Sequence, residues 1–235
     1  MPLFTIDNLR VQYNMGYHKT THAVSGVSLN IEHGESVGLV GESGCGKSTL
    51  SYAVLRLIPA QGNVMFNNEN VFSLHGKQLQ HLRQHMQLIF QDPFSSLNPR
   101  LSVGAALDEV LKVHHLGTRK KRDNRIMELL EMVGLEPEYA WRYPHEFSGG
   151  QRQRIGIARA LTVKPSLIIA DEPVSALDVS VQVQILNLMK RLQEQEQLAY
   201  LFIAHDLAVV RYMCTRIYVM YLGRIMESAR CDDLF

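Results

Sequence analysis

The chain has few of the features that mark a secreted or membrane-spanning protein. Its 235 residues contain only three cysteines. They are far apart and odd in number, so we expect neither a disulfide framework nor a cysteine-ligated zinc site. No apolar run is long enough to span a bilayer, and no signal pattern is present at the start. If the protein works at a membrane, we expect a different chain to cross it.

An excess of charge of either sign is also absent. Lys and Arg number 24 against 23 Asp and Glu, which gives a formal net charge of +1. This balance does not call for a polyanionic partner or an acidic substrate. The strongest basic run, residues 119–122, has no aromatic residues interleaved with it. We therefore interpret it as a solvated turn between two helices, and we expect no nucleic-acid partner.

What the chain does contain is a phosphate-loop motif. Residues 41–49 read GESGCGKST and match G-x-x-x-x-G-K-[ST]. The apolar residues 36–40 before the motif are typical of a buried strand, and the sequence after it is typical of a helix. Glycines let such a loop bring several backbone N–H groups onto one anion at the start of the helix. The motif therefore predicts a nucleoside triphosphate site, with Lys47 at the β- and γ-phosphates and Ser48 at Mg²⁺.

Two further stretches place polar groups at the ends of buried strands. The apolar residues 166–170 precede Asp171 and Glu172, and the apolar residues 201–204 precede His205. The carboxyl ends of strands are where an α/β sheet binds its ligands. An Asp in that place is suited to hold Mg²⁺, and an adjacent carboxylate is suited to act on a nucleophilic water.

A second candidate anion site lies at residues 147–151, which read FSGGQ and precede a helix predicted over residues 152–161. Ser148 suits the N-cap of that helix, and the glycine pair permits close approach by a ligand. Alone, this signal is weak because Ser-Gly-Gly is a common turn.

The pattern along the chain predicts an α/β fold. Alternating strands at residues 4–12 and 23–31 indicate a small antiparallel sheet beside the α/β core. A helical pattern over about residues 103–135 lies between core strands. The remaining predicted elements are a strand at residues 87–91, a helix at 181–195, and two strands about a Leu222–Gly223 turn within 216–228. We expect one nucleotide-binding domain over residues 1–235, with the core and β subdomain in 1–91 and 148–235 and a helical subdomain in about 92–147.

Tyr13 ends the first predicted strand. An aromatic ring there either stacks on a purine base or packs on the sheet. Tyr17, in the loop that follows, is a rival for the same role, and the sequence leaves these alternatives open.

Taken together, these motifs resemble the nucleotide-binding subunit of an ATP-binding-cassette (ABC) transporter, and the resemblance covers nearly the whole chain. GESGCGKST is similar to the Walker A loop, LIIADE to Walker B, and SGGQ to the signature motif. Gln91 resembles the Q-loop residue, Asp178 ends a D-loop-like SALD, and His205 resembles the switch histidine. Each motif is weak alone, but all six occur in the order of the family. QDPFSSLNPR and DEPVSALDVSVQVQILNL are most similar to the importers of oligopeptides, dipeptides and nickel.

The resemblance implies a P-loop NTPase core of the RecA-like type that binds ATP with Mg²⁺. It implies Glu172 as general base, His205 at the γ-phosphate, and Mg²⁺ held by Ser48 and Asp171 with Gln91 nearby. Tyr13 is implied to stack on adenine. The phosphate-binding residues implied are Gly41, Ser43, Gly44, Cys45, Gly46, Lys47, Ser48 and Thr49. Those implied to close on the ATP of a second subunit are Ser148, Gly149, Gly150 and Gln151, with Asp178 at the same site.

The resemblance also implies partners. Two such subunits, identical or related, sandwich two ATP molecules head to tail, and integral membrane permease subunits carry the solute. An extracytoplasmic substrate-binding protein acts indirectly, and the chain is peripheral at the cytoplasmic face of the inner membrane. Such subunits usually continue past the position of Phe235, so the chain resembles a truncated or a short member. The alternatives are an exporter or cell-envelope ABC ATPase, which QDPFSSLNPR disfavours, and a soluble nucleic-acid-associated ABC ATPase, which the single cassette disfavours.

Overall fold

The computed structural model describes residues 1–14, 20–92 and 97–234. Its larger sheet consists of β3 (Ser36–Val40), β6 (Met86–Ile89), β7 (Leu167–Asp171), β8 (Ala199–Ala204), β9 (Arg216–Tyr221) and β10 (Arg224–Arg230). The strand order is β10-β9-β3-β8-β7-β6, and all neighbours are parallel except β10 and β9. β3, β7 and β8 are buried along their whole length. Burial on both faces explains why these strands are uninterrupted apolar runs in the sequence.

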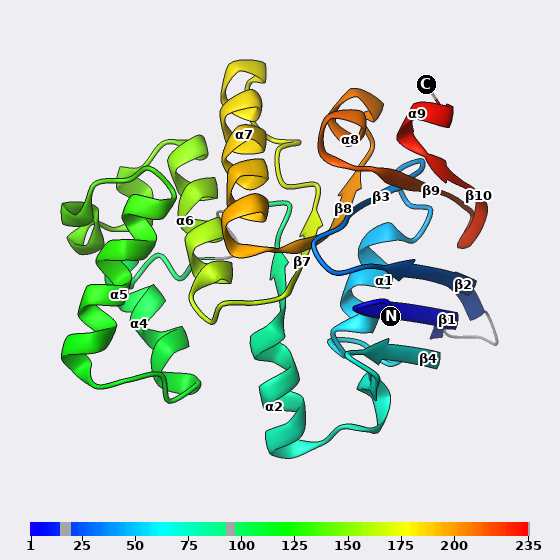
Figure 1. The fold of residues 1–235 in the computed structure, drawn as a ribbon, viewed down its shortest axis with the longest axis horizontal. Helices are drawn as coiled ribbons and strands as arrows, with labels where there is room; N and C mark the ends of the chain where they lie inside the picture. Colours follow the sequence, from blue (N-terminus) through cyan, green and yellow to red (C-terminus); the bar gives the residue numbers. More distant parts are fainter. Residues whose placement is uncertain (15–19, 93–96, 235) are drawn as a thin grey trace.

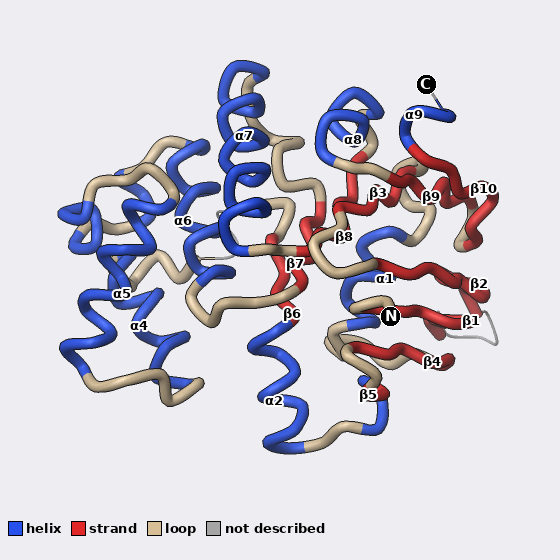
Figure 2. Tube along the Cα trace, in the orientation of Figure 1, coloured by secondary structure: helices blue, strands red, loops and turns tan. Residues whose placement is uncertain are grey.

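A second, antiparallel sheet confirms the prediction of strands ahead of the phosphate loop. Its strands are β1 (Phe4–Asn14), β2 (Thr20–Ile31), β4 (Gln61–Phe66) and β5 (Glu69–Asn70), in the order β2-β1-β4-β5. Figure 2 shows β1, β2 and β4 side by side, apart from the larger sheet. Ile6 of β1, Leu50 of α1 (Lys47–Val54) and Leu201 of β8 belong to one buried cluster. The antiparallel sheet and α1 therefore cover one face of the central strands.

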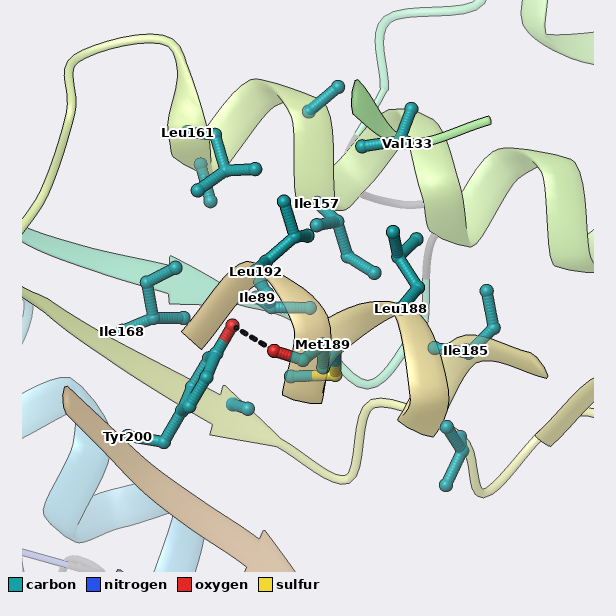
Figure 3. Close-up of a cluster of buried hydrophobic side chains, with 14 of the residues drawn as sticks. Ile89, Val133, Ile157, Leu161, Ile168, Ile185, Leu188, Met189, Leu192 and Tyr200 are labelled. Atoms are coloured by element: carbon teal, nitrogen blue, oxygen red, sulfur yellow. Dashed lines mark hydrogen bonds between the residues drawn. The ribbon is translucent and has the colours of Figure 1, made fainter. Parts of the chain in front are cut away.

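Helices cover the other face. α4 (Val103–Val113), α5 (Arg119–Met132), α6 (Gly149–Leu161) and α7 (Val179–Glu196) gather on the side of the molecule away from the antiparallel sheet (Figure 1). Tyr200 of β8 is fully buried among them, and its hydroxyl donates to the Met189 carbonyl of α7 at 3.3 Å (Figure 3). Alternate residues of β8 thus face opposite clusters, Tyr200 toward the helices and Leu201 toward α1. Within the described ranges, no helix combines the length and apolarity needed to cross a bilayer.

The sequence patterns missed two helices, α2 (Gly76–His85) and α8 (Leu207–Met213). α2 has only two apolar residues, Leu79 and Leu82, and only Leu82 is buried, so it lacks the apolar stripe that identifies a helix. α8 has seven residues, too few for a helical period to stand out. The last short helix, α9, spans Cys231–Leu234.

The basic run at residues 119–122 is not the interhelix turn that we expected. It forms the first turn of α5, with Thr118 at the N-cap. Lys and Arg are good helix formers, and Arg122 Nε lies 2.6 Å from Asp108 Oδ1 of α4. This ion pair holds the start of α5 against α4, while the side chains at residues 119–121 remain exposed.

Candidate active site

The phosphate-loop residues connect the end of β3 to the start of α1, so the loop lies at the carboxyl edge of the central sheet. Gly46 is the N-cap of α1 with φ 110°, a left-handed conformation that favours glycine. Ser43 and Gly44 are exposed, whereas Cys45 is buried. The N-terminus of α1 faces the loop, and unpaired N–H groups at such a terminus favour an anion.

Lys47 extends its side chain across the inside of this loop. It is 5% exposed, and its Nζ donates to the carbonyl oxygens of Gly41 at 2.8 Å and Glu42 at 2.9 Å. The ammonium group is therefore held over the loop by neutral acceptors and has no carboxylate partner among the ion pairs of the described residues. Its charge is available to a polyanion such as a triphosphate.

Ser48 and Asp171 form the next part of the site. Ser48 Oγ donates to Asp171 Oδ1 at 3.1 Å, and Asp171 is 2% exposed at the end of β7. Burial raises the pKa of Asp171, and the neighbouring Glu172 raises it further, while the Ser48 hydrogen bond and Lys47 oppose the shift. A buried carboxylate beside a hydroxyl is a donor set that fits Mg²⁺, because a cation would offset the cost of burying the ionised form.

Glu172 has an unusual backbone conformation. Its φ is 47°, which costs free energy for a non-glycine residue and is typical of functional sites. Its N–H donates to the Ile203 carbonyl of β8 at 2.9 Å. Its Oε2 accepts a hydrogen bond from Gln91 Nε2 at 3.0 Å and lies 3.4 Å from His205 Nδ1. Two predicted residues from different segments thus converge on one carboxylate oxygen of a third.

These groups come from the ends of neighbouring strands. Lys47 and Ser48 follow β3, and His205 follows β8. Asp171 is the last residue of β7, Glu172 comes directly after it, and Gln91 follows β6. The sheet order β3-β8-β7-β6 sets them in a row along one edge. The row offers a polyphosphate cradle, a cation-binding pair and a carboxylate with the reach of a general base.

Tyr13 lies on β1 opposite Thr21 and is 40% exposed, so its ring is open to a base. Tyr17 lies outside the described residues. Sequence reasoning missed Tyr52 of α1. Burial raises the pKa of Tyr52, with further contributions from Asp171 and Tyr13, so this phenol lies near both. The signal for it was available, because residues four apart share a helix face and Tyr52 follows Ser48 by four.

The Ser148–Gln151 segment lies elsewhere in the molecule. Ser148 is the exposed N-cap of α6, its Oγ accepts from the Gln151 N–H at 3.3 Å, and its own N–H donates to Gln151 Oε1 at 3.0 Å. α6 packs against α4, α5, α7 and β6, whereas α1 packs against β1, β2 and β7. Figure 1 shows α6 and α1 on opposite sides of β7. The structure therefore does not bring this second anion site to the first.

The glycines of this segment pack against the start of α7. A Cβ at Gly150 would lie 2.5 Å from Val181 Cγ1, and one at Gly149 would lie 3.4 Å from Leu177 Cδ2. Asp178 occupies the exposed N-cap position of α7 and makes no side-chain capping bond there. The segment and Asp178 thus belong to one solvent-facing region that holds no phosphate loop of its own.

Sequence comparisons point to one family. The model of the ABC transporter family matches residues 24–175. The oligopeptide transport ATP-binding protein OppF of Bacillus subtilis is 57% identical over 222 residues, which cover 92% of this chain and 72% of that protein. A putative peptide import ATP-binding protein of Brucella ovis is 52% identical over 235 residues, 100% of this chain and 74% of that protein.

Solved structures agree. A dimeric structure of the ATP-binding cassette MJ0796 in a post-hydrolysis state, bound to ADP and Pi, has a TM-score of 0.86 at 31% identity and covers 97% of this chain and 98% of that one. A second dimeric structure of MJ0796, described as a bacterial ABC transporter cassette, has a TM-score of 0.87 over the same shares. The α/β fold with a phosphate-loop core is thereby confirmed.

Proposed function

Because the chain belongs to the ABC transporter family, as a subunit that binds and hydrolyses ATP, we propose that it powers the uptake of peptides through separate membrane-spanning subunits. The observation that carries the proposal is the row of groups at the carboxyl edge of the sheet, in which Lys47, Asp171 and Glu172 lie with Ser48, Gln91 and His205. The relatives named as peptide importers support the choice of solute.

Each residue of that row receives a role. Lys47 and the loop amides of Gly41–Thr49 hold the phosphates, with Tyr13 against the adenine. Ser48 and Asp171, with Gln91, would hold Mg²⁺, which neutralises part of the phosphate charge when bound. Glu172 takes a proton from the attacking water, and its carboxylate is already oriented by Gln91 Nε2 at 3.0 Å. His205, 60% exposed at its side chain, is free to contact the γ-phosphate.

The second anion site supports a dimer. Ser148, Gly149, Gly150 and Gln151 lie away from the chain's own phosphate loop, so they are free to close on the ATP of a second subunit. Asp178, exposed beside them, would lie at the same interface. ATP then acts as the adhesive between two subunits, and hydrolysis releases them, because a ligand bound only in the closed state shifts that equilibrium. The partner is an identical or a related chain.

A groove supports the docking of a membrane subunit. It has a volume of about 480 Å³ and lies between α2, β6, α4 and α6. Three side chains that line it each have a buried polar atom without a hydrogen-bond partner in the described structure, namely Arg83 Nε, His114 Nδ1 and Gln153 Nε2. Unsatisfied buried polar atoms are uncommon in folded proteins. Because these atoms are shielded from solvent, a docked permease segment would bond them only once the side chains turn toward the groove.

The groove also has a short path to the active site. Phe90 lines it, and the next residue, Gln91, bonds Glu172. Movement of a docked segment would therefore reach the general base through one peptide unit. This gives a reason to treat residues about 92–147 as a helical subdomain that moves relative to the core in 1–91 and 148–235. The subunit would work at the cytoplasmic face of the inner membrane. An extracytoplasmic substrate-binding protein would deliver the peptide to the permease subunits and so act on this chain only indirectly.

Uptake of a labelled tetrapeptide by cells that lack their own subunit tests the proposal. Val113, which is 53% exposed in the groove, is changed to Asp, and Met226, which is 64% exposed on β10, receives the same change as a control. We expect Val113→Asp to keep its soluble ATPase activity but to lose both permease co-purification and uptake, while Met226→Asp keeps all three. If the wild-type chain hydrolysed ATP but restored no uptake, and nucleic acid changed its ATPase rate, the result would favour a soluble nucleic-acid-associated ABC ATPase.

A further inference from the structure

The turn between β9 and β10 contacts the back of the phosphate loop. The Gly223 N–H donates to the Cys45 carbonyl at 2.9 Å, and the Gly223 carbonyl accepts from the Ser25 N–H of β2 at 2.7 Å. One residue, 178 positions beyond Cys45 in the sequence, therefore links the phosphate loop to the antiparallel sheet. Both bonds use backbone atoms, so they do not depend on side-chain rotamers.

The same contact region is closely packed. A Cβ at Gly41 would lie 2.1 Å from the Met220 carbonyl oxygen, and one at Gly46 would lie 2.2 Å from the Ala23 carbonyl oxygen. A Cβ at Gly223 would lie 2.9 Å from that same Ala23 oxygen. Real Cβ atoms do not come this close to backbone oxygens. The phosphate loop is thus seated closely on the backbones of β2 and β9, and the Met220 side chain of β9 packs beside Gly46.

The backbone conformation of the turn is unfavourable for one of its two residues. Tyr221 and Arg224 are paired, which leaves Leu222 and Gly223 as a two-residue connection with φ 44° and 79°. A turn with two positive φ values favours Asn or Gly at both positions. Leu222 is therefore unfavourable there, and its side chain is 71% exposed, so burial does not compensate. Such outliers persist only where the surrounding structure fixes them.

We propose that the β9–β10 turn is a positioning element of the ATP site, with Gly223 as its positioning residue. Through the two backbone hydrogen bonds of Gly223, the turn fixes the distance between the phosphate loop and β2. β2 pairs with β1 so that Thr21 lies opposite Tyr13, two residues before Ala23. The turn thereby sets the spacing between the phosphate end of the site and the tyrosine at its other end. Neither the dimer nor the permease enters this inference.

Gly223→Ala tests the proposal, with Gly34→Ala as the matched control. Both glycines lie in turns at positive φ, 79° and 68°, but a Cβ at Gly34 would meet nothing within 4 Å. We expect both variants to lose thermal stability, since both force alanine into a left-handed conformation, and Gly223→Ala to lose more, because its Cβ also meets the Ala23 carbonyl oxygen. Only Gly223→Ala should raise the Kd for a fluorescent ATP analogue and the KM of the ATPase. The expected rise is about threefold to tenfold, the scale of one distorted hydrogen bond, with kcat at saturation within about twofold.

Three further measurements complete the test. Leu222→Asn should keep the wild-type KM and melt no lower, because Asn suits the turn. If Gly223→Ala does not fold, Gly223→Asn adds a Cβ at the same place with less backbone strain. In the unmodified protein, the Gly223 amide should be protected from hydrogen exchange. A folded Gly223 variant with wild-type KM, an equal rise of KM in Gly34→Ala, or a freely exchanging Gly223 amide would each overturn the proposal.

Discussion

Replacing Ser148 separates the binding of ATP from the closure of a dimer. In the free chain, Ser148 caps α6, whose main packing partners among the described residues are α4, α5, α7 and β6 rather than α1. Ser148→Arg should therefore leave ATP binding to the monomer unchanged. The background for the test is Glu172→Gln, in which hydrolysis no longer reopens a closed pair. Gln retains an oxygen that accepts from Gln91 Nε2, so the site should keep its shape.

The expected magnitudes follow from the local structure. Loss of the 3.3 Å capping bond between Ser148 Oγ and the Gln151 N–H costs about 1 kcal/mol, which is small against a domain stability of roughly 5–15 kcal/mol. In a closed pair, each arginine occupies space meant for a phosphate. Overpacking costs about 1–3 kcal/mol per site. A closed dimer contains two Ser148–Gln151 segments, so the total free-energy cost is about twice that of one site. The dimer Kd should therefore rise by about 30-fold or more.

Light scattering with and without ATP measures dimer formation, and a fluorescent-nucleotide titration measures ATP binding to the monomer. Ser148→Ala is the matched control, because it loses the same capping bond without adding bulk. We expect Glu172→Gln to dimerise with ATP, the added Ser148→Ala to dimerise also, and the added Ser148→Arg to stay monomeric while binding ATP normally.

Two results would refute the reasoning. If Ser148→Arg abolished ATP binding to the monomer, the segment would serve its own chain's nucleotide. If the double variant dimerised as tightly as Glu172→Gln alone, Ser148 would not lie at the closing interface.

Three other perturbations have definite expected outcomes. Glu172→Gln should keep ATP binding but lower steady-state turnover by roughly 10²-fold or more, the scale of general-base loss, and near-normal phosphate release would remove Glu172 from that role. Tyr13→Ala should weaken ATP binding by about 1–3 kcal/mol, while Tyr13→Trp is tolerated. If a nucleotide titration showed weaker ATP binding for Tyr17→Ala and normal binding for Tyr13→Ala, the stacking role would move to Tyr17. Asp171→Asn should abolish hydrolysis yet melt no lower than wild type in EDTA. The reason is that burial raises the pKa of Asp171, so its ionised form is costly when no cation is bound. A clear drop in Tm would show instead that the carboxylate stabilises the free protein.

The sequence predicted the central strands, and the polar residues of the candidate site at their ends, for a physical reason. β3, β7 and β8 are buried on both faces, so their residues are largely continuous apolar runs, and the candidate site residues Asp171, Glu172 and His205 stand at the ends of β7 and β8. The phosphate loop has fixed glycine positions because backbone geometry demands them. In these places, local chemistry alone determines the structure.

Other features depend on contacts that no local pattern encodes. α6 begins at Gly149 rather than at Arg152, because the capping box of Ser148 and Gln151 starts the helix through two glycines of poor helix propensity. The bond from Gly223 to Cys45 joins residues far apart in sequence. The convergence of Gln91 and His205 on one oxygen of Glu172 required the strand order, which hydrophobic periodicity does not supply.

The separation of Ser148 from the phosphate loop has a consequence for genetics. In a mixed pair of identical chains, suppose that one chain carries defects in both Lys47 and Ser148 and the other is normal. In the proposed sandwich, each of the two composite sites then contains one damaged half, and both fail. If instead one chain carries the Lys47 defect and the other the Ser148 defect, both damaged halves meet in one site, and the second site is wholly intact. Within such a mixed pair, two lesions on separate chains should thus leave one working site, whereas the same two lesions on one chain leave none.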